Sequence, residues 1–156
     1  MTKQKTISAA LALSALLSFG SAQASGNVSY TVTNAKWKEE CGSCHIAYPP
    51  KLLPAESWKA VMSGLDKHFG SDASLDAAAH AEISTFLLDN AGKRKRDAAA
   101  KPALRITETG WFKREHSETP TSTWKNPTVK SAANCSGCHT QAENGNFSEA
   151  NIRVPK

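Results

Sequence analysis

The chain has 156 residues and a formal net charge of +5 at pH 7, and this length fits one or two small domains. Hydrophobic residues make up 40% of it, so two halves of about 60 residues would each form only a marginal core without further support. Beyond residue 24 no apolar stretch approaches the length that crosses a bilayer, which excludes a polytopic membrane protein.

Residues 1–24 have the pattern of a secretory signal peptide. Lys3 and Lys5 provide a basic start. An apolar run from Ile7 to Phe19 follows, and a small-x-small cleavage site at residues 22–24 completes the pattern. The run is too short for a good transmembrane helix, although an uncleaved N-terminal anchor is the alternative. We therefore expect cleavage and export, to the periplasm if the source is a Gram-negative bacterium.

Residues 25–92 predict an N-terminal helical domain after an irregular lead-in. A first helix begins near Lys36 and ends before Pro49, because proline cannot continue a helix. A second begins at Pro54 and has apolar residues at i, i+3, i+4 and i+7. These residues are Trp58, Val61, Met62 and Leu65. A third helix is expected after an N-cap at Ser74 and ends at Gly92.

Residues 93–104 are rich in basic side chains and predict a solvated linker, which could also attract an acidic redox partner. The second half, 105–156, shows less regular patterning. Residues 109–116 favour a short helix, 117–130 a loop, and Ser131 is a candidate cap for one more helix. The tail from residue 143 is polar. The expected fold class is mainly α and loop-rich, with little or no sheet.

All four cysteines of the chain lie in two five-residue motifs. The motifs are Cys41-Gly42-Ser43-Cys44-His45 and Cys135-Ser136-Gly137-Cys138-His139. Both read C-x-x-C-H, the attachment signal of a c-type haem. Thiols three positions apart can each form a thioether to the porphyrin edge, and the adjacent histidine reaches the iron. Two matches that use every cysteine predict two covalently attached c-type haems.

Other uses of C-x-x-C explain less of the pattern. A thioredoxin-like redox motif needs a βαβ context, and no strand pattern flanks either motif. A zinc site would join both cysteine pairs, and a disulfide framework would suit an oxidising compartment. Neither explains why each pair is followed directly by its own histidine.

The second axial ligand decides what each iron can do, because a closed iron transfers electrons and an open one binds gases or peroxide. Of five histidines, His45 and His139 belong to the motifs. His68 and His116 each share one half of the chain with a motif and are the candidate partners. The simplest pairing joins His45 with His68 and His139 with His116, and a crossed pairing stays open.

Two further side chains are weaker candidates for an iron ligand. His80 lies in an Ala-rich helix on the flank of an apolar face, and we expect it to be exposed. Met62 is the only methionine left after removal of the signal peptide. It shares an apolar face with Trp58 and Leu65, so we expect it to pack in the core.

Longer segments carry a resemblance that is more specific than the motifs. They include EECGSCHIAYPPKLLPAESWKAVMSGLDKHFG over residues 39–70 and RITETGWFKREH over residues 105–116. On these segments the chain resembles the DHC-type dihaem cytochrome c family. The resemblance implies a class I cytochrome c-like N-terminal haem lobe and an irregular C-terminal haem lobe. It places the iron ligands at His45, His68, His116 and His139, with both irons bis-His ligated.

The family resemblance also implies a function. It suggests a periplasmic electron carrier that works with a membrane cytochrome b and a small oxygen-binding monohaem cytochrome, and not an enzyme. Two propionates on each haem would bring the net charge close to neutral, so the basic sequence is no argument for nucleic-acid binding. The alternatives are a dihaem peroxidase or gas-binding sensor with one open iron, and a subunit that folds only against a membrane complex.

Overall fold

The computed structural model describes residues 28–31, 33–93 and 101–156. Within these ranges the chain forms α-helices and short 3₁₀ turns, and its β pairing is limited to isolated bridges. This confirms the mainly α, loop-rich fold class. The predicted signal peptide and most of the basic linker lie outside the described residues.

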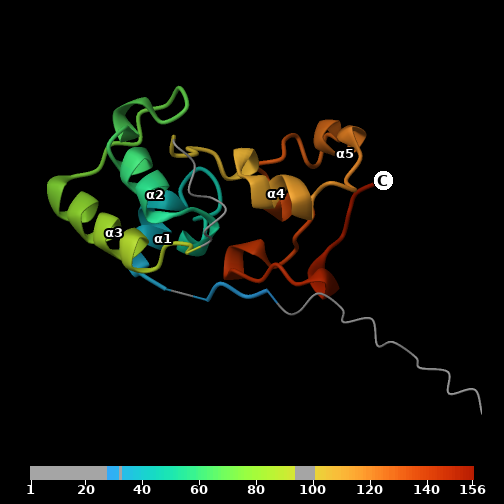
Figure 1. Cartoon of the computed structure of the whole chain (residues 1–156), viewed down its shortest axis with the longest axis horizontal. Helices are drawn as coiled ribbons and strands as arrows, with labels where there is room; N and C mark the ends of the chain where they lie inside the picture. Colours follow the sequence, from blue (N-terminus) through green and yellow to red (C-terminus); the bar gives the residue numbers. More distant parts are fainter. Residues whose placement is uncertain (1–27, 32, 94–100) are drawn as a thin grey trace, which may run out of the picture.

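Three helices form the N-terminal half. They are α1 (Ala35–Cys41), α2 (Ala55–Met62) and α3 (Ala77–Asp89), and they lie together on one side of the molecule (Figure 1). Both α1 and α2 pack against α3. The core between them consists of Trp37, Leu53, Trp58, Met62, Ile83, Leu87 and Ala91. The predicted apolar face of α2 therefore points inward, and Met62 packs as expected.

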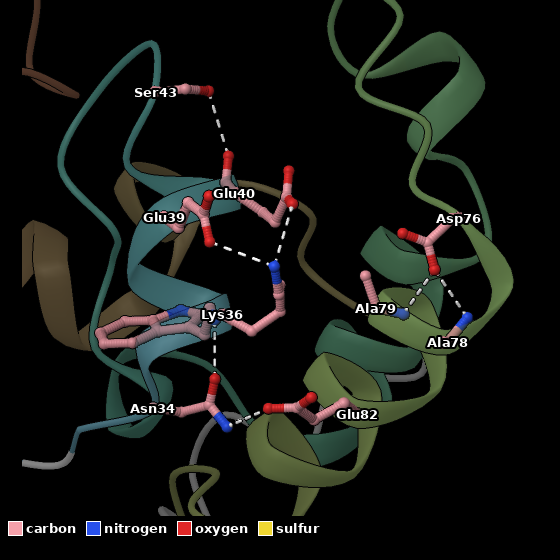
Figure 2. Close-up of polar contacts among 10 residues, drawn as sticks. Asn34, Lys36, Glu39, Glu40, Ser43, Asp76, Ala78, Ala79 and Glu82 are labelled. Atoms are coloured by element: carbon pink, nitrogen blue, oxygen red, sulfur yellow. Dashed lines mark hydrogen bonds and ion pairs between the residues drawn. The ribbon is translucent and has the colours of Figure 1, made fainter.

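Side-chain caps begin α1 and α3 (Figure 2). The Asn34 side chain accepts a hydrogen bond from the Trp37 amide and donates one to Glu82 on α3, so it also joins the two helices. The expected cap at Ser74 is wrong. Asp76 caps α3 instead, because its carboxylate accepts from the amides of the second and third helical residues, as an N-cap side chain does.

The first helix is shorter than expected. It ends at Cys41 and does not carry Cys44 and His45, which follow in an irregular turn. Gly42 stands at the end of the helix, and a Cβ there would collide with the Lys38 carbonyl oxygen. Glycine is a poor helix former, so the chain leaves the helix well before Pro49. Pro49 and Pro50 are instead buried around a 3₁₀ turn at Pro50–Leu52.

The C-terminal half contains two short helices, α4 (Gly110–Glu115) and α5 (Thr121–Lys125). The first is the helix predicted over 109–116, and Thr109 caps it by accepting from the Phe112 amide. The second lies in a segment expected to be loop. The second motif forms only a 3₁₀ turn at Cys135–Gly137, and the helix expected after Ser131 is absent there. The Asn134 side chain donates to the Val129 carbonyl and ties this turn to a fully buried residue.

The lead-in before α1 contacts the end of the chain. The Tyr30 amide donates to the Gly145 carbonyl, and the Phe147 amide donates to the Val28 carbonyl, both at 2.8 Å. This pairing surrounds an antiparallel bridge between Ser29 and Asn146. In Figure 1 the blue segment passes below the molecule to reach the red C-terminal region.

Candidate haem-binding sites

The first site is built where α1 ends. Cys41 is the last residue of the helix, Cys44 is exposed, and neither cysteine forms a disulfide. The His45 ring is exposed, and its Nδ1 lies 2.7 Å from the Ile46 carbonyl oxygen. A hydrogen bond donated from Nδ1 to a carbonyl fixes the tautomer that leaves Nε2 available to a metal.

His68 faces His45 from the turn that follows α2. The ring centroids are 6.2 Å apart. Helix α2 ends at Met62, and a 3₁₀ turn at Leu65–Lys67 places His68 at the surface of the core. The next two residues are left-handed, with φ of 51° at Phe69 and 99° at Gly70. Gly70 therefore serves this reversal of the chain.

Electrostatics favour the neutral form of His68. Burial lowers its pKa, and the neighbouring His45 and Arg105 lower it further. The Arg105 guanidinium lies 3.8 Å above the centre of the Phe69 ring, so the second half of the chain covers the residue next to His68. A neutral imidazole is the form that binds a metal.

The second site has the same arrangement in the C-terminal half. His116 follows α4, and its Nδ1 lies 2.9 Å from the Phe112 carbonyl oxygen. Its ring stacks on the Phe112 ring at 4.0 Å and faces His139 with ring centroids 6.1 Å apart. Burial lowers the pKa of His139. Its Nδ1 is buried and has no hydrogen-bond partner among the described residues.

The spacing of both histidine pairs fits an iron between the rings. Two metal–imidazole bonds of about 2 Å each, with roughly 1 Å from each ligating nitrogen to its ring centre, place two imidazole centroids about 6 Å apart. The observed separations of 6.2 Å and 6.1 Å match this value. The structure thus brings together the simplest of the predicted pairs, and each pair adjoins one cysteine motif.

His80 takes no part in either pair. It is half-buried, not exposed as expected, because its Nε2 lies 3.1 Å from the Met62 carbonyl oxygen. This contact bridges α3 and the end of α2, and it gives His80 a structural role in the N-terminal core.

The environment of the cysteines argues against the other uses of C-x-x-C. Burial raises the pKa of both Cys41 and Cys135 to about 11, whereas the reactive thiols of redox motifs have lowered pKa values. The part of the chain that the structure describes contains no group of three or more His, Cys, Asp or Glu side chains placed to hold a metal ion. The two cysteine pairs are therefore not joined in one zinc site.

Three aromatic side chains complete the sites and were not singled out from the sequence. Trp124 on α5 lies 5.9 Å from the His116 ring, and Phe147 lies 5.2 Å from the His139 ring. Tyr48 stacks on His45 at 4.7 Å. Burial raises the pKa of Tyr48 to about 12, so its hydroxyl stays protonated near neutral pH. An aromatic residue in an otherwise polar segment was the available signal for Trp124 and Phe147.

The two motifs also lie close to each other in space. A cavity of about 480 Å³ is lined by Cys44 and His45 of the first motif and by Ser136 of the second. Two C-x-x-C-H motifs, each with a second histidine opposite its own, on a small helical and loop-rich fold define the chain as a multihaem c-type cytochrome.

The comparisons with known proteins agree. The family model for dihaem cytochrome c matches residues 37–147. A solved dihaem cytochrome c from Rhodobacter sphaeroides is 41% identical, with 75% of this chain and 98% of that chain covered and a TM-score of 0.69. A solved dihaem cytochrome c from Shewanella baltica OS155 is 40% identical, with 80% of this chain and 95% of that chain covered and a TM-score of 0.69. No curated protein matches. The chain belongs to the dihaem cytochrome c family, and its two motifs correspond to two c-type haems.

Proposed function

We propose that this protein is a periplasmic electron carrier whose two haems are both closed by histidine pairs. Cys41 and Cys44 would hold one haem, with His45 and His68 on its iron. The second would be held by the cysteine pair of the other motif. Its iron would be bound by His139 and His116. The observation that carries this proposal is the pair of facing imidazoles at each motif, separated by 6.2 Å and 6.1 Å.

When bound, each haem supplies an iron that gains and loses one electron. The protein keeps the ligands in place in both oxidation states. His45 and His116 are each fixed by a hydrogen bond from Nδ1 to a nearby carbonyl, and the ring of His116 is held further by stacking on Phe112. Ligands that need not move suit electron transfer, because little rearrangement accompanies the change in charge.

The redox partners we propose are a membrane cytochrome b as donor or acceptor and a small oxygen-binding monohaem cytochrome. Family resemblance supports this choice. Among the residues that the structure describes, no helix has the length and apolar character needed to cross a bilayer. The signal-peptide pattern of residues 1–24 supports the periplasmic location.

The visible spectrum of the purified holoprotein tests the proposal. We expect two haems per chain and low-spin spectra in the oxidised and reduced forms, with no change on adding carbon monoxide. A spectral change in half of the haem absorbance on adding carbon monoxide would show that one iron is open. It would favour the peroxidase or gas-sensing alternative. Binding of the purified protein to membranes that contain a cytochrome b, compared with membranes that lack it, tests the partner.

A further inference from the structure

Tyr48 is in contact with both cysteine motifs. It follows His45 by three residues, and its ring stacks on the His45 imidazole with centroids 4.7 Å apart and planes at 27°. Its hydroxyl donates a hydrogen bond of 2.6 Å to the Ala133 carbonyl oxygen. Ala133 lies two residues before Cys135, so one side chain connects a candidate iron ligand of the first site with the attachment segment of the second.

Both ends of this connection are anchored in the rest of the protein. On one side, Tyr48 precedes Pro49 and Pro50, which are fully buried, and the Pro50 carbonyl accepts a hydrogen bond from the Trp58 indole. On the other side, the Asn134 side chain donates to the carbonyl of buried Val129. The hydroxyl–carbonyl bond therefore joins two rigid segments and not two free loops.

Two other contacts between the halves do not involve a motif residue. The Trp111 indole donates to the Leu52 carbonyl at 3.3 Å, and Arg105 lies over Phe69. The Tyr48 bond lies at the two motifs, which line the same cavity. A functional constellation tolerates displacements of only about 0.5 Å, so the residues that lock such segments together matter to it.

We propose that Tyr48 is a positioning residue that sets the separation and mutual orientation of the two haem attachment segments. In that role it controls how fast an electron exchanges between the two sites. This inference rests on the proposed electron-carrier function and adds the residue that couples its two centres.

The variant Tyr48→Phe tests the inference, because it keeps the stacked ring and removes only the hydroxyl bond. We expect two covalently attached haems and low-spin spectra, as in the wild type. In half-reduced protein, the rate of electron exchange between the sites, measured by two-dimensional exchange NMR, should fall severalfold. The spacing between the two reduction potentials and the magnetic interaction between the two ferric centres in EPR should both change.

Trp111→Phe is the matched control, since it removes another hydrogen bond between the halves, whose acceptor, the Leu52 carbonyl, lies outside both motifs. It should lower the melting temperature and leave the exchange rate and the EPR interaction unchanged. Tyr48→Leu, which loses both the ring contact and the hydroxyl bond, should slow the exchange more than Tyr48→Phe. An unaltered exchange rate and EPR interaction in Tyr48→Phe would overturn the inference, as would equal losses in Tyr48→Phe and Trp111→Phe. Carbon monoxide binding by the wild type would instead overturn the closed-iron proposal.

Discussion

Replacing His116 with alanine should open one of the two irons and leave the other closed. The His116 ring is the group that faces His139, at 6.1 Å between centroids. Its loss removes a stacking contact with Phe112 and a hydrogen bond to the Phe112 carbonyl. Such contacts contribute about 0.5–1.5 kcal/mol each. The combined loss is smaller than the 5–15 kcal/mol that is usual for a folded domain.

The rest of α4 should survive the substitution. Thr109 still caps the helix and Phe112 is still buried, and the substituted residue lies just beyond the last helical residue, Glu115. We therefore expect a folded variant with both haems attached. One haem of the two should become high-spin and bind carbon monoxide, which corresponds to half of the total haem absorbance. Added imidazole should restore the low-spin spectrum by filling the space beside Phe112 and Trp124.

His80→Ala is the matched control for this experiment. His80 contacts the Met62 carbonyl and neither motif histidine, so its loss should leave the haem spectrum unchanged. The reasoning about His116 fails if His116→Ala remains fully low-spin and does not bind carbon monoxide, or if His80→Ala opens half of the haem instead.

Three further outcomes are expected. His68→Ala should open the iron of the other haem. The double variant His68→Ala/His116→Ala should bind carbon monoxide at both irons, which a carbon monoxide titration of the reduced protein would show. In a redox titration, the haem bound by His45 should have a lower reduction potential than the haem bound by His139. The variants His68→Ala and His116→Ala show which potential belongs to which haem. His45 is exposed and donates from Nδ1, whereas the Nδ1 of His139 has no partner among the described residues; the reverse order would contradict this. Asp76→Ala should cost about 1 kcal/mol of stability through loss of the α3 cap, with Ser74→Ala near neutral in the same thermal melts.

The histidine pairs could be predicted because the sequence offered few choices. Two of the five histidines were assigned by the motifs, and three remained: His68 and His80 in the first half and His116 in the second. His80 was set aside because it lies in an Ala-rich helix on the flank of an apolar face, and order along the chain then suggested the simplest pairing, His45 with His68 and His116 with His139. This inference needed no knowledge of helix ends, which is why it was insensitive to errors there.

Helix ends were predicted less well, because several signals compete locally. Pro49 is a strong stop, but Gly42 ends α1 first. Both Ser74 and Asp76 can cap a helix, and Asp76 is the one whose carboxylate reaches two amides. Helix α5 has only five residues, which is too short to show a 3.6-residue period. The contact between Tyr48 and Ala133 spans 85 positions, and no pattern within one segment reports such a contact.

The bridge between residues 28–30 and 145–147 affects the order in which the two sites can be completed during synthesis. His45 and His68 lie on the first segments to be made, and the helices that support them end at Asp89. The second site depends on Phe147, which packs on Tyr30 and His139 together. Residues 28–30 therefore help to enclose the second site only after residues 145–147 are present. The helices that support the first histidine pair are thus complete early in the chain, whereas the second pair is enclosed only when the residues up to Phe147 are present.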